Sequence, residues 1–207
     1  MATPKPKPGD PIPELVESLL VELGEDPDRQ GLRATPDRVA RAMRELTSGY
    51  GVKPEEVVAD AVFDQDYDEM VVVKDIAFYS LCEHHMLPFF GHVHVGYLPK
   101  GKVVGLSKIP RLVEVFSHRL QIQEKLTNEI AEALNQAVAP RGVGVVVEAR
   151  HLCLEMRGIE TPGGRMITSC MLGTFRRDQR TRAEFLDLVH RPSYTPARCR
   201  TPLGPHT

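Results

Sequence analysis

Four runs of β-branched and apolar residues, interrupted in the middle by two amphipathic stretches, constrain the fold of this chain more than any other feature. The first run is MVVVKDIAFYSL from Met70, and the second is HVHVGYLP with KVVGL, which predicts a strand ending near Leu106. Two more strands are predicted by VGVVVEARHL after Gly142 and by RMITSCMLGTF after the turn residues 162–164. This order predicts an α+β fold with an antiparallel four-stranded sheet and two long helices on one face.

Helical periodicity marks the remaining segments. Ser107 with Pro110 begins one helix of the central pair, and apolar residues spaced along 122–137 mark the other. Before the strands, leucines within 13–23 predict a helix, and Thr35-Pro36 predicts the N-cap and first residue of a second. A short helix is expected over 180–189. The predicted divisions are a disordered Pro/Lys-rich tail at 1–12, an N-terminal helical region at 13–68, an α+β domain at 69–189 and a mobile Pro-rich tail at 190–207.

Charge and composition exclude several classes of protein. Twenty-six Lys and Arg residues stand against 28 Asp and Glu, a net charge of −2 with histidine neutral. This balance disfavours a polybasic surface, so we expect neither nucleic acid nor a membrane as a partner. No apolar run is long enough to span a bilayer, and MATPKPKPGD lacks the apolar stretch of a signal peptide. We therefore expect a cytoplasmic protein whose four cysteines are core thiols, metal ligands or nucleophiles.

The densest chemical signal is the motif CEHH at residues 82–85, at the end of a predicted strand. Its C-x-x-H spacing allows the thiolate of Cys82 and the imidazole of His85 to reach one tetrahedral Zn²⁺. Cys153, in the HLC motif of a later strand, supplies a third ligand. Three protein ligands leave a fourth position for water, which is the pattern of a catalytic rather than a structural zinc site.

Two histidines beside these ligands are candidates for proton transfer, because an unperturbed imidazole has a pKa of about 6.5. His84 precedes one ligand directly, and strand alternation would turn His151 and Cys153 toward one site. Two other interpretations remain open: the cysteines are buried core thiols, or His151 is a fourth ligand that closes a structural site. The isolated histidines are interpreted as structural, and they are His92, His94 and His118.

A second polar cluster lies in GLSKIPR at residues 105–111. Ser107, Lys108 and Arg111 would surround a helix N-terminus, where exposed N–H groups and the helix dipole favour an anion. The alternative is a solvated helix start, and the glycine spacing of a P-loop is missing. Arg157 could add a bidentate phosphate contact. Glu124 is either an exposed helix residue or a carboxylate that accepts two N–H donors from a base edge such as that of guanine.

Together these segments resemble the GTP cyclohydrolase I family, the zinc-dependent type with the T-fold. The resemblance covers roughly residues 15–189, and its segments occur in the family's order. They are TPDRVA (35–40), FYSLCEHH (78–85), GLSKIPRLVEVF (105–116), QIQEKLT (121–127), HLCLEMRG (151–158) and TRAEFL (181–186).

The resemblance implies roles for the residues already singled out. It implies zinc at Cys82, His85 and Cys153, acid–base groups at His84 and His151, guanine binding by Glu124, and triphosphate binding by Ser107, Lys108, Arg111 and Arg157. The implied reaction opens the imidazole ring of GTP hydrolytically and gives 7,8-dihydroneopterin triphosphate and formate, the first step of tetrahydrofolate and pterin biosynthesis. It further implies a catalytic T-fold domain at 69–189 and a homo-oligomer, a toroidal decamer of two pentamers with active sites at subunit interfaces.

Two rival functions remain. A different T-fold enzyme acting on a pterin or deazapurine would share the fold without needing the three zinc ligands, the GLSK cluster and Glu124 together. A zinc-stabilised oligomeric binding module would need a closed, four-ligand metal site, which recruits His151. Entry of an inhibitor into an open metal position separates the module from the enzyme.

Overall fold

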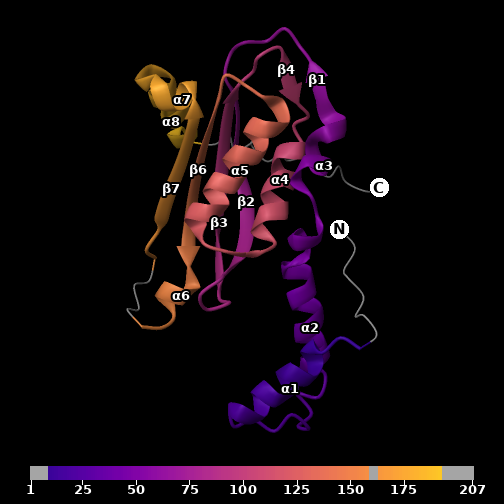
Figure 1. Ribbon diagram of the computed structural model, residues 1–207. Coiled ribbons are helices and arrows are strands. Elements are labelled where there is room, and N and C mark those ends of the chain that lie inside the picture. Colours follow the sequence, from indigo (N-terminus) through magenta and orange to yellow (C-terminus); the bar gives the residue numbers. More distant parts are fainter. Residues whose placement is uncertain (1–8, 159–162, 193–207) are drawn as a thin grey trace, which may run out of the picture.

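The computed structural model describes residues 9–158 and 163–192, and it confirms the α+β class. Figure 1 shows a long twisted sheet with two helices, α4 and α5, across one face. The strand order in this sheet is β5-β2-β3-β6-β7. The strands are β2 (Val71–Cys82), β3 (Pro88–Leu98), β5 (Leu120–Gln121), β6 (Gly142–His151) and β7 (Met166–Gly173).

The main core lies between the sheet and the helices α4 (Lys108–Ser117) and α5 (Gln123–Val138). Alternation along β6 sends Val145 and Val147 into this core, while Val146 faces the other way. Leu126 of α5 is fully buried there. A buried side chain of this size contributes roughly 1.5–3 kcal/mol, so the sheet and the two helices stabilise one another.

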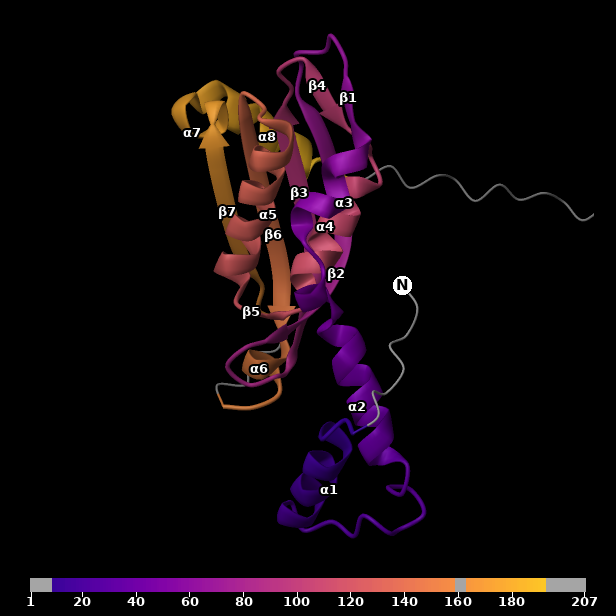
Figure 2. The same ribbon diagram turned by 45° about the vertical axis from the view of Figure 1, so that its right-hand side comes forward.

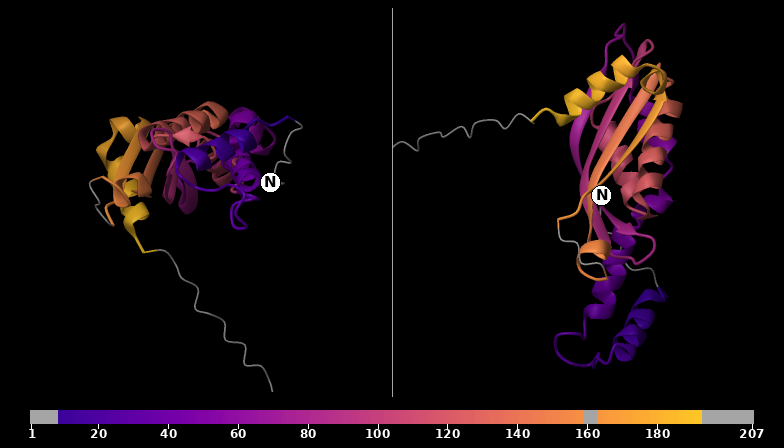
Figure 3. Two further views of the ribbon diagram at one scale, coloured as in Figure 1. Left: turned by 90° about the horizontal axis from the view of Figure 1, so that it is seen from below. Right: turned by 90° about the vertical axis from the view of Figure 1, so that its left-hand side faces the viewer.

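A smaller core covers part of the opposite face, where α7 (Thr174–Arg177) and α8 (Gln179–His190) pack on the sheet. Figure 3 shows α8 on the side of the strands away from α4 and α5. Phe175 and Phe185 meet edge to face, with ring centroids 5.4 Å apart. Gly96 and Gly144 make room for them, because a Cβ at either position would lie 2.7 Å from an aromatic carbon.

The predicted four-stranded antiparallel sheet needs two corrections. The four long strands do pair antiparallel, but Leu120–Gln121 adds a fifth, short strand that runs parallel to the end of β2. The second strand ends at Leu98 rather than near Leu106, because Pro99 and Gly101, with a φ of 73°, turn the chain. The following β4 (Lys102–Val104) pairs instead with β1 (Val62–Asp64) in a separate two-stranded sheet.

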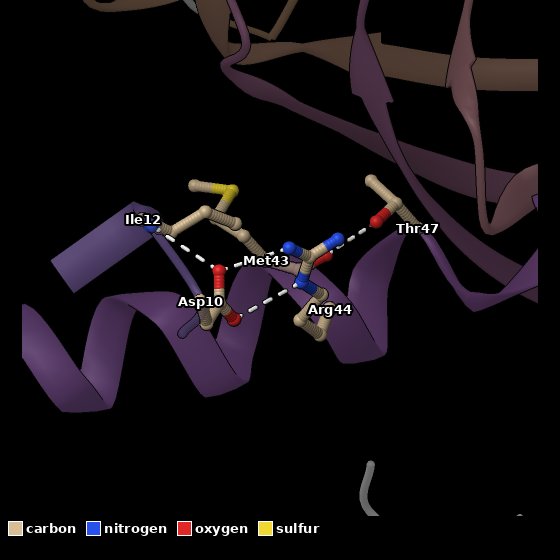
Figure 4. A network of polar contacts seen from close by, with 5 residues as sticks. All are labelled: Asp10, Ile12, Met43, Arg44 and Thr47. Atoms are coloured by element: carbon tan, nitrogen blue, oxygen red, sulfur yellow. Dashed lines mark hydrogen bonds and ion pairs between the residues drawn. The ribbon is translucent and has the colours of Figure 1, made fainter. Parts of the chain in front are cut away.

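The N-terminal helices form a hairpin that extends beyond one end of the sheet (Figure 2). Thr35 is the first residue of its helix and not the N-cap, which is Ala34 without a side-chain hydrogen bond. The chain before the hairpin is fixed to it by Arg44, whose guanidinium binds the carboxylate of Asp10 at 2.9 Å (Figure 4). The elements of this region are α1 (Ile12–Glu22), α2 (Thr35–Leu46), the 3₁₀ turn Ser48–Gly51, α3 (Pro54–Val58) and the 3₁₀ turn Ala59–Ala61.

The tails predicted at 1–12 and 190–207 fall mostly outside the described residues, apart from 9–12 and 190–192. Within the described ranges, no helix is both long and apolar enough to cross a membrane.

The structure places His94 in the interior of β3, where its Nδ1 accepts a hydrogen bond from the backbone N–H of Asp75 at 3.1 Å. Burial lowers the pKa of His94. The charges of Asp75 and Glu148 oppose this shift, whereas His92 and Lys74 add to it. Below about pH 6.5 the unfolded chain therefore binds a proton that the folded chain excludes, so the free energy of unfolding should fall as the pH drops below this value.

Urea unfolding at fixed protein concentration, at several pH values between neutral and mildly acidic, measures this slope. Replacing His94→Gln should flatten it, whereas the matched change His92→Gln at an exposed position of the same strand should leave it in place. An unchanged slope in the His94→Gln protein would contradict the assignment.

Candidate metal centre

Three metal-binding side chains converge at one end of the sheet. The ligand atoms of Cys82, His85 and Cys153 all lie within 4.8 Å of one another. The Cys82 side chain is buried, that of Cys153 is half-buried and that of His85 is exposed. The structure thus brings together the three ligands predicted from the sequence.

A tight turn after β2 places the first two ligands. The N–H of Cys82 donates to the carbonyl of Leu87 at 2.9 Å, and the N–H of Met86 donates to the carbonyl of Cys82 at 2.8 Å. Met86 adopts a left-handed conformation with a φ of 55°. These bonds close the loop from β2 to β3, and Glu83 ties it to β5 by donating its N–H to the carbonyl of Gln121 at 3.0 Å.

The third ligand comes from a helix, which corrects the expectation that His151 and Cys153 share a strand face. Strand β6 ends at His151, opposite Phe89, and the short helix α6 (Leu152–Glu155) begins at the next residue. Figure 1 shows α6 at the lower end of the sheet, away from β4. Cys153 reaches the site because the chain turns, not because strand residues alternate.

The chemistry of this donor set fits a zinc ion. Burial raises the pKa of the Cys153 thiol, and the neighbouring Cys82 raises it further, whereas the charge of Arg157 lowers it. Two adjacent thiols resist losing both protons, and a divalent cation between them would reverse that preference. Zinc binds thiolate sulfur and imidazole nitrogen well, whereas magnesium and calcium bind oxygen ligands instead. A set of three protein ligands leaves one coordination position of a tetrahedral zinc open.

The two candidate acid–base histidines lie beside this cluster. The ring of His84 is exposed and sits 6.2 Å, centroid to centroid, from the ring of His85. His151 is half-buried and stacks on Phe89 at 4.7 Å with 7° between the ring planes. Burial lowers the pKa of His151, and the negative charge of Glu124 partly offsets this shift.

Gln123 is a residue of this site that sequence reasoning missed. Its side chain is fully buried, and its Oε1 lies 2.8 Å from Nε2 of His151. The only sequence signal was its place directly before Glu124 at the start of a helix, which does not distinguish a buried glutamine from an exposed one.

The predicted substrate-binding residues fall into two groups. Glu124 and Arg157 are exposed at the metal-cluster end, close enough for their charges to act on His151 and Cys153 respectively. The second group comprises Ser107, Lys108 and Arg111 at the beginning of α4. Within a single chain this group does not reach the metal cluster.

The geometry of α4 explains the separation. Its far end meets β2 near the metal cluster, because Ser80 donates to the carbonyl of Arg119 and Leu120 pairs with Leu81. The helix has 10 residues, so its beginning lies about 15 Å away. There the ammonium of Lys108 binds the carboxylate of Asp60 at 2.7 Å and lowers its pKa.

An α+β fold that brings together two cysteines and one histidine, with two more histidines beside them, has a donor set of the kind found in metal-dependent enzymes. Comparison with known proteins narrows this class. Residues 12–190 match the family described as GTP cyclohydrolase I. The chain belongs to the GTP cyclohydrolase I family, and it is an enzyme of that kind.

Several relatives named GTP cyclohydrolase 1 support this membership. One from Gloeobacter violaceus is 55% identical over 87% of this chain and 85% of its own length. One from Coxiella burnetii is 55% identical over 87% of this chain and 98% of its own. One from Methylococcus capsulatus is 59% identical over 86% and 96%. A solved structure titled archaeosine synthase QueF-Like aligns at a TM-score of 0.41 with 23% identity, over 50% of this chain and 93% of that one, which is too distant to inform the site.

Cysteine replacements test the metal cluster directly. The change Cys153→Ala removes one of the three ligands. Losing a residue that only supports a ligand lowers metal affinity by about 10- to 100-fold, so losing the ligand itself should lower zinc affinity by more than about tenfold. Elemental analysis of protein washed at defined free zinc measures the bound metal. Cys170→Ala, at a free thiol on β7, is the matched control and should retain zinc. Equal zinc content in both variants would exclude Cys153 as a ligand.

Proposed function

We propose that this chain converts GTP and water to 7,8-dihydroneopterin triphosphate and formate, the entry step to tetrahydrofolate-type pterins. The observation that carries the proposal is the convergence of Cys82, His85 and Cys153 beside His151, in a chain of this family. Residues 69–189 form the catalytic unit, with the α1–α2 hairpin as an extension of it. A cytoplasmic location remains a prediction from the sequence.

The three ligands Cys82, His85 and Cys153 would hold zinc. Bound there, the ion would supply Lewis-acid chemistry and lower the pKa of a water molecule toward neutrality. The chain's own task is then to orient the purine, to exclude bulk water and to move protons.

Two proton transfers are demanded by the reaction. Opening the five-membered ring requires water to add at C8 and a ring nitrogen to receive a proton as the C8–N bond breaks. His151, fixed by Phe89 and half-buried, is placed to accept the proton that the added water releases and to pass it to that nitrogen, and the exposed His84 is placed to exchange protons with solvent. A second hydrolysis then releases C8 as formate, and the ribose carbons rearrange and close the pterin ring with loss of one water.

Substrate recognition is assigned to charged groups at two places. The carboxylate of Glu124 would accept two hydrogen bonds from the guanine edge. Ser107, Lys108, Arg111 and Arg157 would bind the triphosphate, with Lys108 exchanging Asp60 for a phosphate oxygen.

Since the beginning of α4 lies about 15 Å from the metal end of the same chain, we infer that a neighbouring copy supplies it. A closed ring in which one surface of each copy meets a different surface of the next would repeat this shared site. The proposed assembly is a toroidal decamer of two pentamers.

The activity itself is tested by incubating the purified protein with GTP, with and without chelator and zinc add-back. Formate and a fluorescent pterin, after mild oxidation, should appear together and should depend on zinc. Formate without pterin would indicate that the reaction stops at a ring-opened product. Neither product from zinc-loaded, oligomeric protein would contradict the proposal and favour another T-fold enzyme or the binding module.

The shared site is tested by mixing two inactive variants. Cys153→Ala removes the metal ligand and Lys108→Ala removes the phosphate ligand, so each homo-oligomer should be inactive. Co-expressed in one assembly, they should recover about one quarter of wild-type activity, because random mixing joins an intact ligand set to an intact lysine at that fraction of interfaces. No recovery in verified hetero-oligomers would place both groups in the same copy.

A further inference from the structure

Gln123 stands at the first position of α5 with its side chain fully buried against the sheet. Its Nε2 lies 3.0 Å from the carbonyl oxygen of Val147, 3.0 Å from that of Met166, and 3.1 Å from the hydroxyl of Thr168. Its Oε1 lies 2.8 Å from Nε2 of His151. The partners on each side of a buried amide show which side carries the oxygen and which carries the NH₂ group, because each partner can only donate or only accept in a given contact.

The two carbonyls settle the orientation of the amide. A carbonyl oxygen accepts hydrogen bonds and never donates them, so the NH₂ group of Gln123 must face Val147 and Met166. The reversed amide would instead set its own oxygen about 3 Å from two carbonyl oxygens in a buried site, and a buried polar atom left without a partner costs roughly 1–3 kcal/mol.

The neighbouring hydroxyls agree with this orientation. Thr127 donates to the backbone carbonyl of Gln123 at 2.6 Å, so its single proton is used. The 2.7 Å contact between the two threonine hydroxyls must therefore be donated by Thr168 to Thr127. Thr168 keeps a lone pair that can accept from Nε2 of Gln123, whose two hydrogens are shared among this hydroxyl and the two carbonyls.

The orientation of the amide fixes the proton on His151. Because Oε1 of Gln123 only accepts, Nε2 of His151 must carry the hydrogen that joins them. In a neutral imidazole the other nitrogen then bears the lone pair. Among the described residues, Nδ1 of His151 has no hydrogen-bond partner, so it is the nitrogen open to a ligand. Phe89 fixes the plane of the ring, and Gln123 fixes its rotation within that plane.

We propose that Gln123 is a positioning residue that holds His151 as the Nε2–H tautomer and thereby presents Nδ1 to the reacting purine. The proposal rests on the role of His151 given above. Gln123 itself is buried behind the histidine and acts through it.

The tautomer is measured by solid-state ¹⁵N NMR of histidine-labelled, zinc-loaded protein, which is not limited by the size of an assembly. The difference between wild-type and His151→Asn spectra isolates the His151 ring, recorded at about pH 8 so that an ordinary imidazole is neutral. A protonated Nε2 with a bare Nδ1 is expected. A protonated Nδ1, or a doubly protonated ring, would overturn the proposal.

Variants then test whether this bond matters for the reaction. Gln123→Met keeps the length of the side chain and removes its hydrogen bonds, so kcat should fall about 10- to 100-fold while KM and bound zinc stay unchanged. Gln136→Met, the same change at an exposed position of α5, should have no effect. Loss of zinc or a proportional rise in KM in the Gln123→Met protein would indicate a merely structural role and overturn the proposal.

A double variant separates action through His151 from general damage. If Gln123 works only through the histidine, adding Gln123→Met to His151→Asn should change kcat by no more than about twofold. A full additional loss would overturn the proposal. If His151→Asn alone is fully active, the proposed role of His151 fails, while the NMR spectrum still decides the tautomer, so the two failures are distinguishable.

Discussion

The site depends on the direction of three strands. β2 and β6 both pair antiparallel with β3, so they run in the same direction and their last residues lie at the same end of the sheet. Cys82 is the last residue of β2, and His151 is the last residue of β6. Residues far apart in the sequence therefore meet because backbone hydrogen bonds fix where each strand stops, and the turn after β2 and helix α6 add His85 and Cys153 to the cluster.

Polar groups in the interior refine what the strands position. The sheet places Val147 directly opposite Thr168, with Met166 two residues earlier on the same strand as Thr168, and helix α5 inserts Gln123 against all three. Burying an amide is costly unless its hydrogen bonds are made, so the Gln123 amide has one favoured orientation. That orientation in turn sets the tautomer of the His151 ring. The chemistry of His151 is in this way linked to the packing of α5 on the sheet.

Much of this could be predicted from sequence, and the failures have physical causes. Period-two runs and helical spacing predicted the long strands and helices, and C-x-x-H with a later cysteine predicted three side chains that the structure brings together. The short strand at Leu120 was missed because two residues have no periodicity. The break after Leu98 was missed because KVVGL continues the apolar pattern past a turn. The distance between Lys108 and the metal cluster could not be predicted from the sequence motifs. That distance depends on the direction in which helix α4 runs along the sheet, and a motif does not encode this direction.

The proposed chemistry requires Cys82, His85 and Cys153 to hold zinc in a three-ligand site. The most direct measurement is an anomalous difference map, collected on both sides of the zinc absorption edge from crystals of the protein as purified. One strong zinc peak per chain is expected, within bonding distance of the two sulfurs and the imidazole, with His151 outside the coordination sphere. A peak bound by other residues, or His151 as a fourth ligand in a closed site, would contradict it.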